Sequence, residues 1–498
     1  MTLERPNPDQ HPGLTRLADP RLLRGLAYVG GRWTAADTAA DLAVTDPATG
    51  ALVARVARLG LPETDRAIAA ATAAFPAWRS RLPQDRGQIL RRWAALMTEA
   101  REDLALLMVL EQGKPLDEAR GEIDYGAAFL DWFAEEGRRM AAETLPSHLP
   151  DAETIVRREA LGPVGLVTPW NFPAAMLTRK AGAALAAGCT VVAHPSAETP
   201  LSALALAELA ERAGMPPGVF NVVTGDAAEI VGRMCADPRL RALSFTGSTS
   251  IGRLITAQAA PTMKRLVMEL GGHAPLIVFA DADLDRAVDI AMQAKFATSG
   301  QDCLAANRIF VERPLHDRFV AAFARRIAAL KVGSGLEPGV EIGPLMHDRA
   351  LAKVVAQVAD ATARGARIVT GGVAHPAGPL FYTPTLLADV PEGAALMAEE
   401  TFGPVAAVLP FDTEAEVIAR ANATEYGLVA YVVTRDGARQ LRLARALEFG
   451  MVAVNRVKIT GAPIPFGGWK QSGLGREGAR QGLEAFTELK YLCIDTAA

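Results

Sequence analysis

The sequence predicts an α/β protein built from two doubly wound sheets, and three observations support this prediction. The chain has 498 residues, 50% of them hydrophobic, which is too long for one core and indicates two or three domains. Two strand–turn–helix units follow each other closely at 165–187 and 190–213, the pattern of a parallel sheet covered by helices. An apolar strand at 275–279 then opens a second alternation of helices and strands, which continues to about residue 465.

The N-terminal part is expected to support the first sheet. Residues 1–20 contain four prolines and predict a loose arm. Residues 28–34, which include two adjacent glycines, predict a hairpin, and the Asp-Pro-Ala-Thr-Gly segment at 46–50 predicts a turn between two strands. Across residues 63–141 the apolar residues recur at spacings of three and four, which indicates several scaffold helices.

Further strands are expected at 219–223 and 242–245, and the second of these leads through Thr246, Gly247 and Ser248 into another helix. Small residues at a helix N-terminus form an anion site from backbone N–H groups and the helix dipole, so a phosphate-bearing cofactor would fit there. The Gly-x-Gly-x-x-Gly fingerprint of the ordinary dinucleotide fold is absent, which weakens that particular interpretation.

Two strand-like segments lie outside both sheets, at 154–158 and 488–494, and we expect them to pair as a small flap used for subunit contact. The glycine-rich segment 465–475 is expected to be a loop. The resulting division is an arm at 1–20, a dinucleotide-binding domain at 21–140 and 160–270, a catalytic domain at 271–470, and an oligomerisation flap at 141–159 and 484–498.

Charge and composition exclude several classes of function. The net charge is -4 and no dense run of Lys or Arg is present. The chain therefore lacks the clustered positive charge that binds nucleic acid or an anionic membrane. The four cysteines are scattered without a Cys-x-x-Cys or His-paired spacing, which argues against a metal site or disulfides and fits a reducing compartment. There is no apolar stretch of about 18 residues. We therefore expect a cytoplasmic protein whose partners are small molecules and other copies of itself.

Cys303 and Glu269 are the candidate reactive residues. Cys303 ends the Gly-Gln-Asp-Cys segment at 300–303, and Glu269 begins the Glu-Leu-Gly-Gly segment at 269–272. A thiolate attacks a carbonyl carbon well, and a carboxylate that activates water can hydrolyse the resulting thioester. A single cysteine is usually a small buried residue, and a single glutamate is usually solvated, but this pair beside glycines indicates a nucleophile and its base.

Six ordered motifs resemble those of the aldehyde dehydrogenase superfamily over essentially the whole chain after the N-terminal arm. The resemblance implies an α/β fold with a Rossmann-type cofactor domain, an α/β catalytic domain and a small β oligomerisation flap. Segments 176–180, 202–210 and 472–478 are most similar to NAD(P)-dependent succinate-semialdehyde dehydrogenases. The six motifs are Pro-Trp-Asn-Phe-Pro at 169–173, Phe-Thr-Gly-Ser-Thr at 245–249, Glu-Leu-Gly-Gly at 269–272, Gly-Gln-Asp-Cys at 300–303, Glu-Thr-Phe-Gly-Pro at 400–404 and Pro-Phe-Gly-Gly at 465–468.

The resemblance implies roles for four catalytic residues. Cys303 would attack the aldehyde, and the side-chain amide of Asn171 and the backbone N–H of Cys303 would hold the oxyanion. Glu269 would activate the water that releases the acid, and Lys180 would support the oxyanion region rather than react. An isolated Asn before Phe-Pro would more simply cap a turn, but the paired motifs favour the catalytic role.

The resemblance also implies a site for NAD or NADP. Gly247 and Ser248 would take the pyrophosphate at a helix start, Trp170 would line the cofactor cleft, and Glu400 would bind the nicotinamide ribose. The whole cofactor-binding set is Trp170, Asn171, His194, Pro195, Ser196, Ala197, Gly247, Ser248, Leu270, Glu400 and Phe402.

Some residues depart from the family pattern. His194 stands where the family usually has Lys, which replaces a fixed charge near the adenosine ribose with a titratable ring. Ala197 stands where NAD-preferring members often carry Glu, so NADP should be tolerated beside NAD. His273 replaces a common Asn. Asp302 would raise the pKa of the Cys303 thiol if it faced the sulfur, but we expect it to point away because adjacent loop side chains diverge.

Substrate residues are the least defined part of the prediction. Arg179 matches an arginine that succinate-semialdehyde enzymes use for the distal carboxylate, whereas Ala297 stands in place of the second such arginine. Lys458 is a candidate substitute charge, although it is not equivalent to a bidentate Arg. A dicarboxylic semialdehyde such as succinate semialdehyde is expected, with a glutarate-semialdehyde-like or neutral aliphatic aldehyde as the alternative.

Two other functions compete with this interpretation. A CoA-acylating relative would have no use for the water-activating carboxylate of Glu269. A catalytically silent binding protein on the same fold would be free to lose Cys303, Asn171 or Glu269. Hydrolytic, NAD(P)-dependent aldehyde oxidation by a homodimer or homotetramer is therefore the function that the sequence favours.

Overall fold

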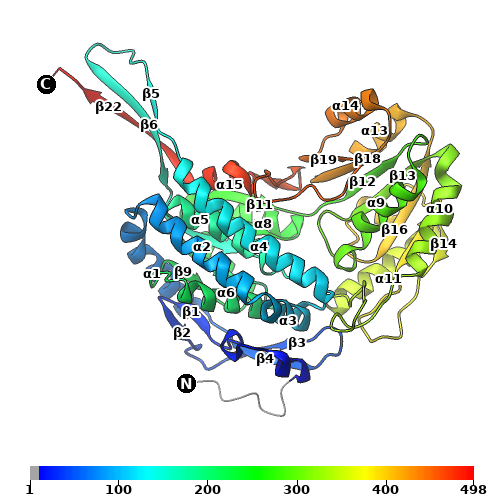
Figure 1. Ribbon diagram of the computed structural model, residues 1–498, viewed down its shortest axis with the longest axis horizontal. Helices are drawn as coiled ribbons and strands as arrows, with labels where there is room; N and C mark the ends of the chain where they lie inside the picture. Colours follow the sequence, from blue (N-terminus) through cyan, green and yellow to red (C-terminus); the bar gives the residue numbers. More distant parts are fainter. Residues whose placement is uncertain (1–10, 498) are drawn as a thin grey trace.

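The computed structural model describes residues 11–497, which form two α/β lobes and a projecting β flap (Figure 1). The first lobe contains an eight-stranded sheet whose five central strands are parallel, with antiparallel strands at both edges. Its spatial order is β2 (Arg32–Thr34), β1 (Ala27–Val29), β9 (Phe220–Val222), β8 (Thr190–His194), β7 (Pro163–Val167), β10 (Ala242–Thr246), β11 (Arg265–Glu269) and β21 (Gly473–Leu474).

Helices cover both faces of this sheet because successive strand residues point to opposite sides. In β8, Val191 packs into a core that includes Trp93, whereas Val192 packs into a second core that includes Ile68. The strand is buried along its whole length, as expected for a parallel strand covered on both faces. The first core contains residues of α2 (Pro83–Glu99), α3 (Arg101–Gln112), α4 (Leu116–Glu136), α5 (Ala175–Ala187) and α6 (Pro200–Arg212), and the second contains residues of α1 (Leu61–Arg79), α7 (Ala227–Ala236) and α8 (Thr249–Ala259).

The second lobe repeats this plan with a seven-stranded sheet in which only the edge strand β14 (Arg367–Thr370) is antiparallel. After β14 the order is β15 (Thr385–Ala388), β16 (Val405–Phe411), β13 (Ala306–Glu312), β12 (Ala274–Val278), β18 (Val429–Val433) and β19 (Met451–Val454). One face carries α9 (Leu284–Phe296), followed by the turn η5 (Ala297–Gly300), and α10 (Arg313–Ala328); the other carries α11 (Asp348–Ala363), α12 (Ala395–Ala398), α13 (Glu414–Asn422) and α14 (Gly437–Ala446).

The two sheets meet by opposite edges. Strand β11 ends at Glu269 and β12 begins at Ala274, so the chain passes directly from the carboxyl edge of the first sheet to the amino edge of the second. Segments that follow the strands of the first sheet are thereby brought to segments that precede the strands of the second. Ligands bind at the carboxyl ends of open parallel sheets. A ligand-binding site is therefore expected at this junction.

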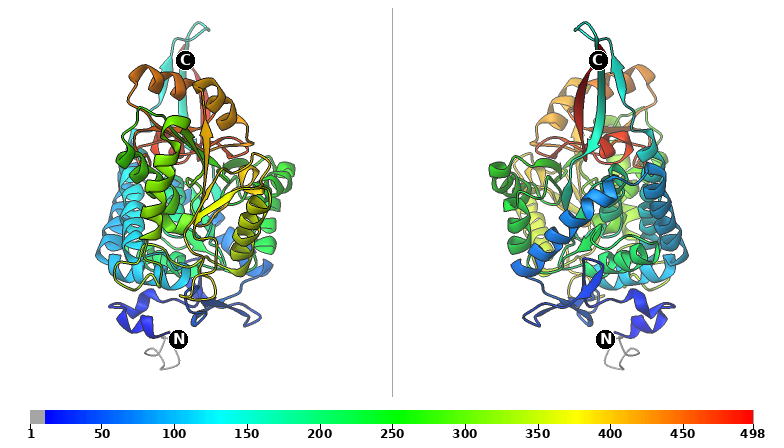
Figure 2. Two further views of the ribbon diagram at one scale, coloured as in Figure 1. Left: turned by 90° about the vertical axis from the view of Figure 1, so that its right-hand side faces the viewer. Right: turned by 90° about the vertical axis from the view of Figure 1, so that its left-hand side faces the viewer.

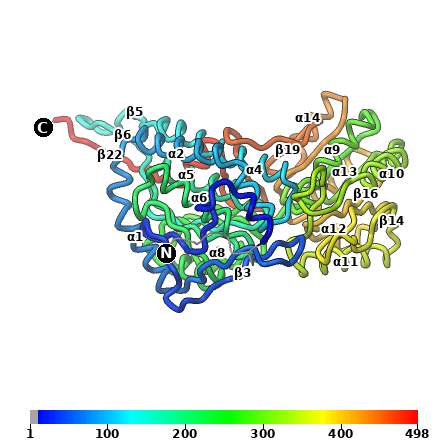
Figure 3. The backbone as a smooth tube through the Cα atoms, turned by 60° about the horizontal axis from the view of Figure 1, so that its bottom comes forward, coloured from blue at the N-terminus to red at the C-terminus, as the bar shows by residue number. Residues whose placement is uncertain are grey.

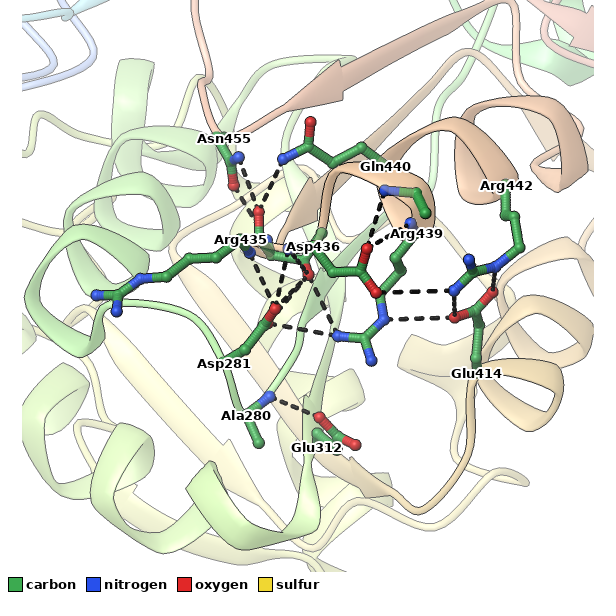
Figure 4. A network of polar contacts seen from close by, with 12 residues as sticks. Ala280, Asp281, Glu312, Glu414, Arg435, Asp436, Arg439, Gln440, Arg442 and Asn455 are labelled. Carbon is green, nitrogen blue, oxygen red and sulfur yellow. Dashed lines mark hydrogen bonds and ion pairs between the residues drawn. The ribbon is translucent and has the colours of Figure 1, made fainter.

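The carboxyl edge of the second sheet is closed by a network of polar contacts (Figure 4). The Asp281 carboxylate accepts hydrogen bonds from the backbone N–H groups of Arg435 and Asp436, each at 3.1 Å. Arg439 extends the network to Glu414, at 3.3 Å. These groups therefore satisfy one another at the start of α14.

Residues 11–20 correct one prediction. Residues 1–20 were expected to form a loose arm; residues 1–10 lie outside the described part of the chain, but 11–20 are bound to the first lobe. The Asp103 carboxylate accepts hydrogen bonds from the N–H groups of Ala18 and Asp19, each at 2.8 Å, and Leu14 is buried. This long-range carboxylate holds the segment between the short turns η1 (Pro12–Arg16) and η2 (Pro20–Leu22), and the proline content does not reveal it.

Some connecting segments also form strand pairs. The hairpin of β3 (Asp41–Thr45) and β4 (Leu52–Ala57) encloses the predicted turn at 46–50. The segment 465–475 was expected to be only a loop, but β20 (Trp469–Lys470) pairs with β17 (Tyr426–Gly427), and β21 joins the first sheet beside β11. This return of the chain to the first sheet places Glu477 near the carboxyl end of β11.

The flap consists of β5 (Glu143–Leu145), β6 (Ala152–Ala160) and β22 (Thr487–Asp495). The predicted pairing of 154–158 with 488–494 is confirmed, because β6 and β22 are antiparallel with Val156 opposite Tyr491. Figures 2 and 3 show the flap extending away from both lobes, with the C-terminus beside it. The short helices η3 (Gly137–Arg139), η4 (Ala260–Thr262) and α15 (Ala479–Glu484) complete the described elements.

Candidate active site

A cavity of about 330 Å³ lies between the two lobes, at the carboxyl edge of the first sheet. Its walls come from segments that follow β7, β10 and β11, from the segments that precede β13 and β16, and from the start of α11. Concave, largely apolar sites with a few converging polar groups are typical binding sites. Eight residues that the sequence assigned to the site line it: Trp170, Asn171, Gly247, Ser248, Leu270, Cys303, Glu400 and Phe402.

Cys303 lies on the cavity wall and is half-buried. It follows η5, in which Thr298 and Ser299 have left-handed backbone conformations with φ values of 49° and 57°. Burial raises the pKa of the Cys303 thiol well above its usual range, and the negative charge of Asp302 raises it further. The thiol therefore holds its proton in this state of the protein and must lose it before it can act as a nucleophile.

Asp302 was expected to point away from the sulfur, and its charge nevertheless raises the pKa of the Cys303 thiol. Its carboxylate accepts a hydrogen bond from the Leu304 N–H at 2.9 Å, two residues further along the chain. This local bond keeps the side chain against its own loop, so its charge contributes to the raised pKa of the neighbouring Cys303 thiol. Burial also raises the pKa of Asp302 itself.

Asn171 is held from two sides. Its Nδ2 atom donates to the Gln301 carbonyl at 3.1 Å, and its own carbonyl accepts from Lys114 Nζ at 2.7 Å. Lys114 forms a buried ion pair with Glu122, which in turn accepts from the N–H groups of Ala174 and Ala175 at the start of α5. Because a carboxamide nitrogen carries two N–H bonds, one remains for an oxygen atom in the cavity.

Glu269, at the end of β11, is only 2% exposed. Within residues 11–497 neither oxygen of its side chain has a hydrogen-bond partner, which is uncommon for a buried carboxyl group. Burial raises the pKa of Glu269 well above its ordinary value, and the negative charge of Glu477 adds to the effect. Gly467 leaves room for it, since a Cβ atom there would lie 2.7 Å from Oε1. An unpaired carboxyl group with a raised pKa is suited to proton transfer.

Glu477 contacts two buried cations behind the cavity wall. Arg179 donates from Nε to Oε2 at 2.6 Å, and Lys180 forms an ion pair with Oε1. Lys180 also donates to Thr246 Oγ1 at 2.7 Å, and Thr246 lines the cavity. Burial alone would raise the pKa of Glu477, but the two cations hold it below its usual value. Lys180 therefore supports the wall from behind.

The two residues assigned to the substrate do not line the cavity. Arg179 is 1% exposed, and its guanidinium lies 4.2 Å from the centre of the Phe466 ring while it pairs with Glu477. Lys458 is exposed in the segment after β19 and is not part of the cavity wall. Ala297, which begins η5, brings no charge to the nucleophile loop.

Several of the residues assigned to the cofactor line the same cavity. Trp170 and Phe402 meet edge to face, with ring centres 5.4 Å apart. Ser248 caps the start of α8, where backbone N–H groups point outward. The Glu400 carboxylate accepts from the Gly272 N–H at 2.9 Å, and burial raises its pKa to about 7. Aromatic rings, a helix start and a carboxylate thus line the same cavity.

His194 differs from its expected role. The ring is 1% exposed and its Nδ1 atom bonds the Val223 carbonyl at 2.8 Å, so it is directed into the sheet rather than toward the cavity. Burial lowers the pKa of His194, which keeps the ring neutral rather than titratable near pH 6.5. Pro195 and the half-buried Ser196 and Ala197 follow β8 in the loop before α6, outside the cavity wall.

Three polar residues of the cavity wall, all at one helix start, were not predicted from the sequence. His347, Arg349 and Lys353 belong to the start of α11, and His347 caps this helix through Nδ1, which accepts from the Ala350 N–H at 3.0 Å. The spacing of Arg349 and Lys353 by four residues places both on one face of the helix. The sequence does show two cations on one helix face next to a capping residue. No pattern in the neighbouring sequence, however, indicates that this helix lies near Cys303.

His273, the other departure from the family pattern, is also buried and lies outside the cavity. Its Nε2 atom bonds the Met397 carbonyl at 2.9 Å, and burial lowers its pKa well below the usual value. Among residues 11–497, no group of three or more His, Cys, Asp or Glu side chains could hold a metal ion. Over the same residues, no helix is both long and apolar enough to cross a membrane.

Comparison with known proteins decides the family. The model of the aldehyde dehydrogenase family matches residues 33–492. The chain belongs to the aldehyde dehydrogenase family. The succinate-semialdehyde dehydrogenase of Burkholderia pseudomallei has a similar crystal structure, with a TM-score of 0.95 and 50% identity over 96% of this chain and 100% of that one. The α/β architecture of this aldehyde dehydrogenase is therefore that of the family.

Several relatives of this aldehyde dehydrogenase are similar over almost their whole length. The glutarate-semialdehyde dehydrogenase of Pseudomonas aeruginosa is 51% identical over 96% of this chain and 99% of the relative. A non-phosphorylating aspartate-semialdehyde dehydrogenase of Halomonas elongata is 53% identical over 96% and 97%. The NADP-dependent succinate-semialdehyde dehydrogenase of Escherichia coli is 51% identical over 96% and 99%. The protein is thus an NAD(P)-dependent oxidoreductase that acts on an aldehyde.

The cavity residues fit such a cofactor. Backbone N–H groups at the start of α8, after Gly247 and Ser248, suit a pyrophosphate. Trp170 and Phe402 offer apolar surface for a planar ring, and the Glu400 carboxylate offers an acceptor for ribose hydroxyls. The cations Arg349 and Lys353 on the facing helix would further favour an anionic ligand.

Proposed function

We propose that this aldehyde dehydrogenase oxidises a dicarboxylic semialdehyde, such as succinate semialdehyde, to the diacid, with Cys303 as the nucleophile and Glu269 as the base. The observation that carries the proposal is the convergence of the Cys303 thiol and the Asn171 amide on one cavity wall. The unbonded carboxyl group of Glu269 is buried at the end of the adjoining strand.

The first step is attack by sulfur. Cys303 loses its proton to water, its Sγ atom bonds to the aldehyde carbon, and the carbonyl oxygen becomes an oxyanion. The Asn171 side chain supplies one hydrogen-bond donor to that oxygen, and the backbone N–H of Cys303 supplies the second. Donors aimed at developing charge in this way are worth about 2.7–4 kcal/mol each.

The second step releases the acid. NAD(P), when bound, would supply the hydride acceptor. The Cys303 adduct would lose its C–H hydrogen as hydride while the oxyanion re-forms a carbonyl, which leaves a thioester on Cys303. Glu269, in its ionised form, takes a proton from water as the water oxygen attacks the thioester carbon. The C–S bond then breaks, and the Cys303 thiolate leaves with the electron pair. Lys180 acts from behind the wall by keeping Glu477 paired and Thr246 in place.

The substrate class rests on the relatives and on Arg179. Glutarate, aspartate and succinate semialdehyde, which name the three relatives, each carry a carboxylate besides the aldehyde. Arg179 lies close enough to Cys303 to influence its pKa, but Glu477 already engages the guanidinium. A neutral aliphatic aldehyde is the second candidate, because the Arg179–Glu477 pair and Ala297 leave less free positive charge for a distal carboxylate.

A panel of aldehydes tests the substrate class. Succinate, glutarate and aspartate semialdehyde, butanal and hexanal would be compared by NAD(P)H formation at 340 nm, with and without CoA. One charge-assisted contact is worth about 1.5–3 kcal/mol, so semialdehydes should exceed neutral aldehydes of equal length about tenfold or more in kcat/KM. Equal efficiency for butanal would overturn the substrate class and leave the reaction type. Dependence on CoA would overturn hydrolysis.

Two variants test the chemistry. Cys303→Ala should abolish turnover while cofactor binding stays nearly intact, and substantial residual turnover would disprove the nucleophile. Glu269→Gln should give a burst of NAD(P)H followed by a slow steady state, because it removes only the water-activating step. If burst and steady rate fall equally, Glu269 acts before the thioester forms.

The flap is the proposed subunit contact. Leu489 and Tyr491 lie on one face of β22 and are 57% and 53% exposed, an unusual exposure for large apolar side chains. A homodimer or homotetramer would cover them. Leu489→Asp with Tyr491→Asp should lower the mass measured by light scattering, whereas Lys490→Gln on the opposite face should not. An unchanged mass in the double variant would exclude the flap as the contact.

A further inference from the structure

A helix of the first lobe is bonded to the nucleophile loop of the second. Glu118, in the first turn of α4, accepts a hydrogen bond from the Thr298 N–H with both carboxylate oxygens, each at 3.0 Å. The two residues are 180 positions apart in the chain. Thr298 begins the short stretch that leads to Cys303, so this bond connects α4 to the reactive thiol within five residues of backbone.

The stretch that Glu118 holds has a strained backbone. Thr298, Ser299 and Gly300 have φ values of 49°, 57° and 72°, so three consecutive residues are left-handed. Glycine adopts this conformation freely, but for serine it is uncommon and for the β-branched threonine it is a genuine outlier. Such conformations persist only where surrounding contacts impose them, and they cluster at functional sites.

The contacts that impose this conformation come from different parts of the molecule. Ser299 Oγ accepts from the Gly343 N–H at 2.9 Å and donates to the Gly343 carbonyl at 3.1 Å. Gly300 lies against the Gly403 carbonyl so closely that a Cβ atom would come within 2.3 Å of it. Those partners belong to the second lobe, whereas Glu118 holds the first residue of the run from the lobe that also carries Asn171.

We propose that Glu118 is a positioning residue for aldehyde oxidation: it keeps residues 298–300 left-handed and so presents Cys303 to the aldehyde beside Asn171. The Asn171 side chain bonds the Gln301 carbonyl, at the far end of the same stretch. Glu118 and Asn171 thus fix the two ends of the loop from one lobe. The inference rests on the proposed role of Cys303, and it assigns to Glu118 no contact with the substrate or the cofactor.

The experiment compares Glu118→Ala with Glu118→Gln and with a control on the same helix. Glutamine keeps an acceptor oxygen for the Thr298 N–H, whereas alanine keeps none. The control is Asp117→Ala, because the Asp117 side chain is 92% exposed and pairs only with Arg120 on the surface. Steady-state kinetics would be measured together with the Kd for NAD(P) and the rate at which iodoacetamide labels Cys303 without aldehyde or cofactor.

A displacement of the nucleophile by about 1 Å or less from its reactive position costs about 10- to 100-fold in rate. Glu118→Ala should therefore lower kcat/KM for the aldehyde by about that factor and change the labelling rate of Cys303, while the Kd for NAD(P) stays within about twofold. Glu118→Gln and Asp117→Ala should remain within about threefold of wild type. Wild-type kinetics in Glu118→Ala, or equal losses in Glu118→Ala and Asp117→Ala, would overturn the proposal.

A strain-relieving variant separates positioning from a general loss of stability. Thr298→Gly makes the left-handed conformation accessible without outside support, so combining it with Glu118→Ala should recover most of the lost kcat/KM. If the double variant is as slow as Glu118→Ala, the strained run is not what Glu118 controls. Cys303→Ala distinguishes the two proposals. Turnover in that variant would disprove that Cys303 is the nucleophile. Normal labelling and normal kinetics in the Glu118 variants would disprove only the positioning role of Glu118.

Discussion

Arg179 donates from Nε to Oε2 of Glu477 at 2.6 Å, and both side chains are almost completely buried. The pair joins α5 to the segment that returns from β21 beside the first sheet. A guanidinium that already has a buried carboxylate partner is part of the protein's own structure. Any contact between Arg179 and a substrate carboxylate would have to be made in addition to this ion pair.

Replacing Arg179 with Met should lower the free energy of unfolding. Removing one partner of a buried ion pair leaves the other charge uncompensated and costs about 3–5 kcal/mol. Denaturant unfolding would measure the loss, and Arg480→Met is the control because its side chain is 69% exposed and its surface pair should contribute less than about 1 kcal/mol. A variant that keeps its stability but loses its preference for semialdehydes would show that Arg179 serves the substrate instead of Glu477.

Asp302→Asn should make the Cys303 thiol easier to ionise. Burial and the negative charge of Asp302 both raise the pKa of that thiol, and the substitution removes the second cause. Because only the thiolate reacts with iodoacetamide, the curve of labelling rate against pH should shift to lower pH. Asp317→Asn is the control, since the Asp317 side chain is fully exposed and distant in the chain. An unshifted curve for Asp302→Asn would show that its charge does not reach the sulfur.

The affinity for NAD should increase as the pH rises through neutrality. Burial raises the pKa of Glu400 to about 7, so the carboxylate form, which accepts hydrogen bonds with both oxygens, replaces the acid over this range. One oxygen is used by the Gly272 N–H, and ionisation frees the other for a ribose hydroxyl. Quenching of tryptophan fluorescence between about pH 6 and 8 would measure the Kd. Glu400→Gln should abolish the dependence and the exposed Glu399→Gln should retain it.

Ala197→Glu should depress the use of NADP more than that of NAD. No carboxylate occupies position 197, and the neighbouring Glu198 carboxylate accepts a hydrogen bond from the Ser196 hydroxyl, so position 197 itself does not repel a 2′-phosphate. A glutamate there would do so by like-charge repulsion. The ratio of the two kcat/KM values measures the effect, with the neutral Ala197→Gln as control. Equal ratios in both variants would show that the loop lies away from the 2′ position.

The reactive residues could be found from the sequence because each one lies in a short motif. Asn171 follows the strand expected from residue 165, and Glu269 and Cys303 stand in glycine-containing motifs whose resemblance to the family implied their roles. The pairing of the flap strands was predictable for the same reason, since both segments are strand-like and lie outside the two sheets. Short sequence motifs and strand-like patterns were sufficient to predict these features.

The features that the sequence did not reveal share a different cause. The segment 11–20 was judged by its prolines, but the Asp103 carboxylate binds it from α3. For Arg179 the sequence did not reveal the ion pair with Glu477, which lies 298 residues further along the chain. His194 was expected to be a titratable ring, but the Val223 carbonyl and complete burial keep it neutral. In each case a distant residue decided the environment of the side chain.

By itself the sequence determined the succession of helices and strands, the two α/β units, and the identity of the nucleophile and base as candidates, because these depend on spacing within a few residues. Only the tertiary structure decided that Glu118 accepts a hydrogen bond from Thr298 and that, among the described residues, the Glu269 side chain has no hydrogen-bond partner. It also decided that α11 brings Arg349 and Lys353 to the cavity. Burial and hydrogen bonding depend on atoms that are close in space and far apart in the chain, so no local pattern encodes them.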